Sequence, residues 1–233
     1  EKFEFVRISM RRTDKDEIRR ATYTDAEYKR VHLALRSYTA KNKLIDIDEL
    51  FERQLVRHFV LISANTMMRF GELYQLKWGN VKTLTIEGKR LARVSVKGET
   101  SKVGQSREIT VRGGEYFDRL KDLSEHTNKS DFVFTRHCGK QITKDSMYRR
   151  YPYIMELAEI DDWKERNLTY YSLRHYGITK RVQSGAPILP LSLICGTSVN
   201  HIQNTYYHSE QQEQIDIALG IYKPQNYKDD ILE

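Results

Sequence analysis

Residues 83–112 read TLTIEGKRLARVSVKGETSKVGQSREITVR and decide the fold class of this chain. Three short β-branched segments, TLTIEG, RLARVSV and SREITVR, are separated by the glycine-containing stretches GK and KGETSKVGQ. Short segments of this kind, bounded by turn residues, predict a meander of three antiparallel strands. The sequence on both sides has a helical pattern. The prediction is a mainly α-helical domain with one small three-stranded antiparallel β-sheet.

Two long helical patterns precede the sheet. Thr24 and Asp25 form an N-cap signal, and the apolar positions after it are Tyr28, Val31, Leu33 and Leu35. Residues 47–68 predict a second long helix, and FGELYQLKWGNV (70–81) predicts its continuation to about Lys77.

Helical patterns return after Phe117 and are interrupted by SDFVFTRHCGKQIT (130–143), where residues 132–134 predict a brief extended piece. The helices predicted beyond it are 143–158, 170–184, 188–195 and 198–208, with an amphipathic segment, SEQQEQIDIALGIY, at 209–222.

The composition is that of a folded chain with one substantial core, since 39% of its 233 residues are hydrophobic. No stretch approaches 18 consecutive apolar residues, and the N-terminus lacks the layout of a secretion signal, so we expect a soluble intracellular protein with no membrane partner. Cys138 and Cys195 have no metal-ligand spacing. We therefore expect free thiols and neither a metal nor another cofactor.

The charge is unevenly distributed. The net charge is +7, yet residues 209–233 hold six acidic and two basic side chains, so residues 1–208 carry +11. A basic body suits a polyanion such as DNA, although surplus lysine is also a common solubility feature.

The domain organisation follows from the first helix signal. Residues 1–21 are charged and begin with Glu, which is typical of a linker or the end of a missing N-terminal DNA-binding domain. Residues 22–233 are predicted to form one domain with a C-terminal tail at 209–233.

Three short stretches contain cations in unusual surroundings. In TMMRFGELYQLKW, Arg69 lies among apolar residues and Glu72 is within i,i+3 reach of its guanidinium. In SKVGQSRE, Lys102 lies on the turn side of a hairpin, and in YYSLRHYGITKRVQSG, Arg174 lies in an apolar helical pattern, where a buried arginine needs an anionic partner. Taken singly, these patterns are also those of a surface ion pair, a solvated lysine and a structural arginine.

Taken together they match one chemistry. Transfer of a phosphodiester to a protein hydroxyl without metal requires cations on the non-bridging oxygens, a proton donor for the leaving oxygen and a nucleophile. Two arginines, a lysine and a late tyrosine in GTSVNHIQNTYYHS (196–209) can supply these groups.

The chain resembles the tyrosine recombinase family, the phage-integrase type of site-specific recombinases. The motifs that carry the resemblance are TMMRFGELYQLKW, SKVGQSREITV, YSLRHYGITKRVQSG and ICGTSVNHIQNTYYHS, in the family's order. The resemblance covers residues 22–208 and implies the DNA breaking-rejoining catalytic-domain fold. It also implies a DNA strand transferase that uses a 3′-phosphotyrosine intermediate and neither ATP nor metal.

The resemblance assigns a role to each site residue. Arg69 and Arg174 would clamp the scissile phosphate, Lys102 would protonate the leaving oxygen, and Tyr206 would be the nucleophile. The supporting residues would be Glu72, which orients Arg69, and His175 and His208.

Tyr206 is favoured over Tyr207 on two grounds. The family's tyrosine lies ten residues after the glycine that matches Gly196. Val199, Ile202 and Tyr206 also share one helical face, whereas the next residue is turned by about 100°.

Two positions depart from the family's commonest pattern. Tyr171 stands where the second arginine motif usually has histidine, and Thr197 replaces the histidine that follows the glycine. Both can donate a hydrogen bond to a phosphate oxygen, but neither titrates near neutrality. They are secondary donors in this interpretation, and a general base for Tyr206 is left unassigned.

The resemblance implies double-stranded DNA as partner and a homo-tetramer on two DNA sites, with accessory DNA-bending proteins as further partners. It places the protein in the cytoplasm of a bacterial or phage-infected cell, at the nucleoid. Two alternatives remain: a DNA-binding relative that has lost catalysis, and a type IB topoisomerase with the same phosphotyrosine chemistry. A metal-dependent nuclease fits poorly, because no acidic or histidine cluster has ligand spacing.

Overall fold

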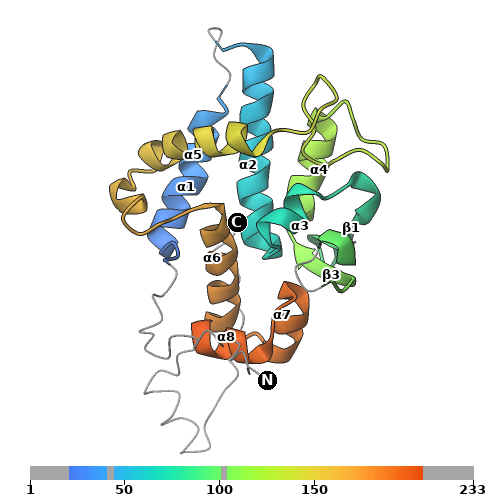
Figure 1. The fold of residues 1–233 in the computed structure, drawn as a ribbon, viewed down its shortest axis with the longest axis vertical. Coiled ribbons are helices and arrows are strands. Elements are labelled where there is room, and N and C mark those ends of the chain that lie inside the picture. Colours follow the sequence, from blue (N-terminus) through green and yellow to red (C-terminus); the bar gives the residue numbers. More distant parts are fainter. Residues whose placement is uncertain (1–20, 41–44, 101–103, 207–233) are drawn as a thin grey trace, which may run out of the picture.

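The fold is described from a computed structural model, in which residues 21–40, 45–100 and 104–206 are placed (Figure 1). Helices predominate, and the helices and strands follow one another in the order predicted from the sequence. The helices are α1 (Asp25–Tyr38), α2 (Ile47–Thr66), α3 (Phe70–Tyr74), α4 (Gly114–Leu123), α5 (Lys144–Leu157), α6 (Tyr170–Gln183), α7 (Ile188–Cys195) and α8 (Val199–Tyr206). Short 3₁₀ turns lie at Trp78–Asn80, Gly98–Thr100 and Asp161–Trp163.

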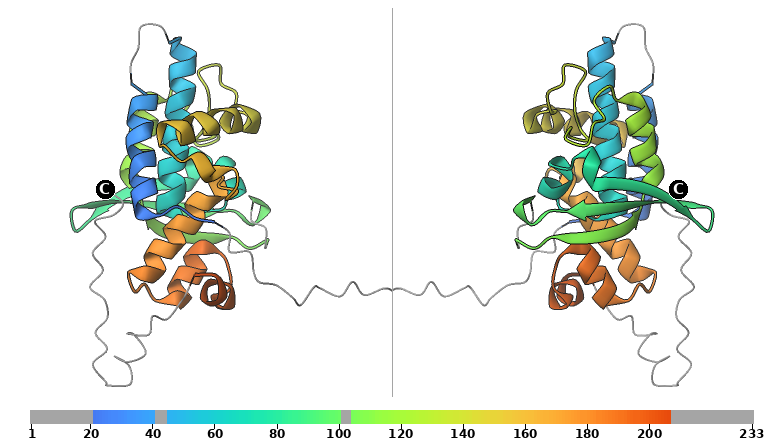
Figure 2. Two further views of the ribbon diagram at one scale, coloured as in Figure 1. Left: turned by 90° about the vertical axis from the view of Figure 1, so that its left-hand side faces the viewer. Right: turned by 90° about the vertical axis from the view of Figure 1, so that its right-hand side faces the viewer.

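The predicted sheet is confirmed. Strands β1 (Val81–Ile86), β2 (Lys89–Val96) and β3 (Arg107–Arg112) are antiparallel and lie in the order β1-β2-β3. The register pairs Val81 with Val94 and Val94 with Ile109. Figures 1 and 2 show the sheet and α3 at mid-height of the molecule, with α1, α2, α4 and α5 above them and α7 and α8 below.

Helix α2 is the centre of the main hydrophobic core. Its last turns, from Leu55 to Thr66, are buried almost all round except at Arg57. Such a helix is covered on every side, here by α1, α4 and α6 among others. A second, smaller cluster below it joins α6, α7 and α8, and its buried members are Met67, Ile178, Leu191, Cys195, Ile202 and Tyr206.

Two local predictions differ from the structure. Leu33 is 50% exposed, and Ala34 and Tyr38 lie on the buried face of α1 instead. The apolar side chain of Leu33 therefore does not mark the core face, and the small Ala34 does.

The helix predicted to run from Ile47 to about Lys77 is broken after Thr66, where Met67 has a φ of 56°, and its second part, α3, ends at Tyr74. The main chain after it pairs with a distant segment: Val133 N donates to Leu76 O at 2.8 Å, and Trp78 N donates to Asp131 O at 3.0 Å. The extended piece predicted at 132–134 is reduced to an isolated bridge between Lys77 and Phe132. Pairing between residues far apart in sequence thus outweighs the local helical pattern.

No helix in the described part of the chain is long and apolar enough to cross a membrane.

The crossing of α2 and α6 depends on Gly177. A Cβ atom at this position would lie 2.2 Å from the carbonyl oxygen of Ala64 and 2.9 Å from Cγ of Met67. The two helices can approach this closely only where the side chain is a hydrogen atom.

We predict that Gly177→Ala lowers the free energy of unfolding by about 1–3 kcal/mol, because the helices must separate. Urea denaturation followed by circular dichroism measures this. Gly71→Ala is the matched control, since its Cβ would lie 4.0 Å from the nearest atom, Nε2 of Gln75. Equal stability of the two variants would contradict the packing explanation.

Candidate active site

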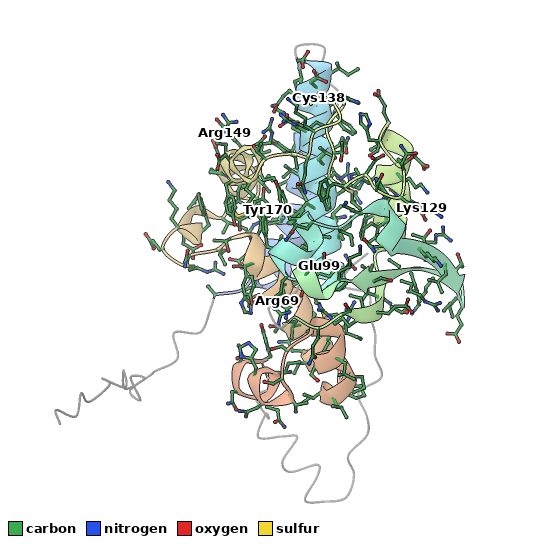
Figure 3. The ribbon with its side chains drawn as sticks, turned by 45° about the vertical axis from the view of Figure 1, so that its right-hand side comes forward. Arg69, Glu99, Lys129, Cys138, Arg149 and Tyr170 are labelled. Carbon is green, nitrogen blue, oxygen red and sulfur yellow. The ribbon has the colours of Figure 1, made fainter. Side chains whose placement is uncertain are left out.

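Arg69 lies at the junction between the upper helices and the α6–α8 layer (Figure 3). The chain reaches it through Met67, the C-cap of α2, whose φ of 56° turns the backbone sharply. Arg69 then caps α3, and its Nη1 donates to Oε1 of Glu72 at 2.9 Å. Its backbone N–H donates to Oε2 of the same carboxylate at 3.1 Å. The ion pair predicted from the sequence is confirmed.

Arg107 is a second partner of Glu72 and was not recognised from the sequence as a site residue. It opens β3, and its Nη1 and Nη2 donate to Oε1 and Oε2 of Glu72 at 3.1 and 2.8 Å. This is the two-point geometry in which arginine binds a carboxylate most strongly. The only sequence signal was a cation at the first position of a strand, which is common on any surface.

Glu72 is 2% exposed and accepts hydrogen bonds from both arginines. Burial alone would raise the pKa of this carboxyl, but the hydrogen bonds and charge of Arg107, followed by those of Arg69, outweigh it and hold the pKa below its ordinary value. Glu72 is therefore ionised at neutral pH and fixes both guanidinium planes.

Arg174 projects from α6 and is 3% exposed. Its Nη2 donates to the carbonyl of Cys195 at 2.9 Å, and its Nη1 donates to the carbonyl of Met67. We expected an anionic partner, but among the described residues no carboxylate pairs with it, and its buried Nε has no hydrogen-bond partner there. Within the described part of the chain, carbonyl dipoles are the acceptors that face the charge of Arg174.

The three arginines converge on one helix end. Arg107 Nε donates to Ile194 O at 3.2 Å, Arg174 donates to Cys195 O, and Arg69 Nη2 donates to Gly196 O. These successive carbonyls close α7, where the helix dipole is negative. With Glu72 counted, the cluster retains two formal positive charges. A cluster with this charge and these N–H donors can bind an anion with several oxygen acceptors.

Gly196 permits this convergence. Its φ of 61° is in the left-handed region, and a Cβ atom there would lie 2.7 Å from Cζ of Arg107. Glycine at this position therefore both ends α7 and leaves room for the guanidinium.

Tyr206 and His175 form a second group beside the arginines. Tyr206, at the end of α8, is 8% exposed, and its hydroxyl is hydrogen-bonded to Nδ1 of His175. Ile202 and Tyr206 are both buried and Val199 is half-buried, which confirms the predicted common face of α8.

The two residues that replace family histidines flank these groups. The ring of Tyr171 meets that of His175 edge-on at a centroid distance of 4.7 Å. Thr197 is half-buried directly after Gly196, and its backbone N–H donates to Ser192 O at 3.0 Å.

Lys102 and His208 fall outside the described residues, as does Tyr207. The structure therefore brings together Arg69, Glu72 and Arg174 around one helix end, and Tyr171, His175 and Tyr206 beside it. The assignments of Lys102 and His208 stay predictions.

Cys195 also lies at this helix end, and burial raises the pKa of its thiol to about 11, although the neighbouring arginines act in the opposite direction. A neutral, buried thiol is a poor nucleophile, so Tyr206 is a better candidate for a nucleophile than Cys195.

Within residues 21–40, 45–100 and 104–206, no group of three His, Cys, Asp or Glu side chains could hold a metal ion.

The model of the phage integrase family matches residues 39–213. No curated protein sequence matches the chain.

Three solved structures illustrate the similarity of fold. The XerH site-specific recombinase in its post-cleavage complex with difH substrate is 19% identical with a TM-score of 0.61, over 87% of this chain and 53% of that one. XerA recombinase is 19% identical with a TM-score of 0.58, over 91% of this chain and 67% of that one. Lambda integrase (75–356) bound to a core site is 16% identical with a TM-score of 0.54, over 84% of this chain and 62% of that one. The chain thus spans about half the length of the XerH chain.

We predict that Glu72→Gln lowers the free energy of unfolding at pH 7 by about 3 kcal/mol or more, because two neighbouring guanidiniums lose their counter-charge. The pKa of Glu72 is lower in the folded chain, so its contribution is present above the ordinary value of 4.5 and is lost as pH falls through the folded value. The difference between parent and variant should therefore shrink when the pH is lowered from 7 to below 4.5.

Urea denaturation at both pH values measures this difference. Glu108→Gln is the control, because Glu108 is 62% exposed in its 3.8 Å pair with Arg93 and should change stability by less than about 1 kcal/mol. A pH-independent difference for Glu72→Gln would contradict an ionised carboxylate in the fold.

Proposed function

Because the chain belongs to the phage integrase family, we propose that it is a site-specific DNA recombinase that cuts and rejoins DNA through a 3′-phosphotyrosine intermediate. The observation that carries the proposal is the convergence of Arg69, Arg107 and Arg174 on carbonyls 194–196, with Tyr206 on the next helix. A cationic site beside a tyrosine hydroxyl is what phosphodiester transfer to a protein side chain requires.

In the proposed reaction, Arg69 and Arg174 hold the non-bridging oxygens of the scissile phosphate. The oxygen of Tyr206 attacks phosphorus, the bond to the 5′ oxygen breaks, and Lys102 protonates that oxygen. Attack by a 5′-hydroxyl on the phosphotyrosine reverses the step and joins the strands. Glu72 and Arg107 keep Arg69 in place, and Tyr171 and Thr197 are secondary donors, with His208 in a supporting role.

We expect phosphate binding to change the hydrogen-bond acceptors of the arginines. Arg69 donates to Gly196 O, and Arg174 donates to Cys195 O and Met67 O. Phosphate oxygens carry a full charge and accept stronger hydrogen bonds than carbonyls do. We therefore expect them to displace some of these carbonyls when DNA binds.

Double-stranded DNA is the proposed substrate. XerH is described with difH substrate, and lambda integrase is described on a core site. The excess of basic charge in residues 1–208 supports the same partner. The protein would act in the cytoplasm of a bacterial or phage-infected cell, at the nucleoid, with accessory DNA-bending proteins as further partners.

The domain proposal assigns residues 22–233 to the catalytic domain, with the tail at 209–233. Residues 1–20 lie outside the described residues, and their interpretation as a linker from an N-terminal DNA-binding domain stays a prediction.

A catalytically impaired DNA-binding relative is the second candidate. Tyr171 and Thr197, in the places of two family histidines, favour it. A topoisomerase with the same intermediate would need no partner duplex, so strand exchange between two defined sites distinguishes it from a recombinase.

We predict that Tyr206→Phe abolishes the covalent protein–DNA band on a nicked suicide duplex in metal-free buffer, because the nucleophilic oxygen is lost. The duplex would carry a core site that the protein selects from a random-sequence pool. Tyr207→Phe is the matched control and should keep the band, which a denaturing gel displays. A band that survives in Tyr206→Phe would reassign the nucleophile, and absence of a band in the parent on a bound site would favour the DNA-binding relative.

The proposed assembly is a tetramer on two DNA sites, joined by the tail of a neighbouring copy. A groove of about 470 Å³ lies between β2–β3 and the start of α7, with Leu91, Leu191 and Ile194 beside Lys89, Arg112 and Arg181. Leu189 and Leu193 on α7 are more than 60% exposed. The tail segment 211–222 is apolar on Ile215, Ile217, Leu219 and Ile221 and is acidic overall. An apolar groove with a cationic edge is complementary to it.

We predict that deletion of residues 211–233 weakens assembly on two sites more than binding to a single site, because the tail docks on protein. A gel-shift titration with one-site and two-site duplexes measures both. Ile194→Ser in the full chain, at a half-buried residue that lines the groove, should reproduce the assembly defect. Equal loss of both kinds of binding would reject the docking proposal.

A further inference from the structure

The tyrosine hydroxyl proposed to attack DNA is hydrogen-bonded to a histidine of the same chain. Its partner is Nδ1 of His175, whose side chain is 3% exposed, and the two rings lie 5.5 Å apart between centroids with an interplanar angle of 34°. A phenol donates to an imidazole nitrogen only when that nitrogen carries a lone pair. With the ring proton of His175 on Nε2, Nδ1 accepts this hydrogen bond, and the hydroxyl proton can pass to the ring.

His175 fills a chemical role that the two substituted positions leave open. Tyr171 and Thr197 carry hydroxyls, which cannot take up a proton near neutral pH. An imidazole nitrogen with a lone pair can accept the phenol proton as the oxygen attacks phosphorus.

The surroundings of His175 hold its ring in one orientation. Tyr171, one helical turn earlier on α6, meets the ring edge-on with an interplanar angle of 70°. From α8, Tyr206 contacts the ring directly, and His201 lies beyond Tyr206 with a centroid distance of 6.2 Å to it. Tyr171 thus packs against the imidazole.

The position of His175 on α6 couples it to the phosphate site. Arg174 is the preceding residue, and successive helical side chains diverge by about 100°. Arg174 points to the carbonyls of Met67 and Cys195, whereas His175 points to Tyr206. One turn of helix therefore places a phosphate clamp and a proton acceptor at a fixed separation.

We propose that His175 is the catalytic base for Tyr206, an assignment that rests on the proposed recombinase function. In strand cleavage, the Tyr206 oxygen bonds to phosphorus, its proton passes to Nδ1 of His175, and the P–O5′ bond breaks. The 5′ oxygen takes a proton from the general acid, for which Lys102 is the prediction. In rejoining, the 5′-hydroxyl attacks, and His175 returns its proton to the departing phenolate.

Two substitutions separate proton transfer from mere positioning. His175→Asn keeps a hydrogen-bonding group near the place of Nδ1 but cannot accept a proton, and His175→Phe removes both functions. His201→Asn is the matched control, since His201 is an exposed histidine on the other side of Tyr206. Melting temperature and gel-shift affinity on the same duplex confirm that each variant folds and binds DNA.

Single-turnover formation of the covalent band on the selected suicide duplex is measured from acidic to neutral pH. Both His175 variants should be slower by about 100-fold or more, the usual contribution of a general base. They should also lose the rise in rate with pH that the parent and His201→Asn show. Rejoining should slow by a similar factor. A 5′-bridging phosphorothiolate, whose leaving group needs no general acid, should not rescue them.

The remaining outcomes overturn the assignment. A His175→Asn rate and pH profile equal to those of the parent would mean that the hydrogen bond only positions Tyr206. Faster cleavage by His175→Phe would mean that His175 restrains the tyrosine. Absence of a covalent band in the parent would reject the proposed recombinase function, and it would thereby also reject the base assignment.

Discussion

The buried carboxylate of Glu72 is the interaction on which the site depends. Arg69 from α3 and Arg107 from β3 both bind it, and at 1% side-chain exposure it has almost no access to water. Two guanidiniums this close would repel each other without an anion between them. Glu72 therefore joins the helical part of the domain to the sheet and sets the planes in which both arginines present their remaining N–H groups.

Those remaining donors bind the last carbonyls of α7, together with Arg174. Backbone dipoles are weaker acceptors than a phosphate, and the cluster keeps a surplus of positive charge. Among the described residues no carboxylate pairs with Arg174. Its guanidinium is therefore held in place by carbonyls that a stronger acceptor such as a phosphate could replace, which fits the proposed function.

The sequence predicted the fold class and the Arg69–Glu72 pair because both depend on neighbours along the chain. Strand alternation and an i,i+3 contact are local. Arg107 is 35 residues from Glu72, and His175 is 31 residues from Tyr206. Such contacts depend on how α6, α8 and β3 pack, and no local pattern encodes them. The same reason explains the early end of α3, where pairing with residues 131–133 replaces a helical turn. Lys102 stays a prediction from sequence alone.

The connection between α7 and α8 consists of Gly196, Thr197 and Ser198. Its first residue accepts a hydrogen bond from Arg69, and its last caps α8 by accepting from the backbone N–H of His201 at 3.1 Å. Because hydrogen bonds hold both ends of this three-residue connection, its length is as constrained as the identity of its residues. One inserted residue would turn α8 by about 100° relative to α7 and carry Tyr206 away from His175. Relatives that keep this pairing should therefore tolerate substitutions between the glycine and the tyrosine far better than insertions or deletions.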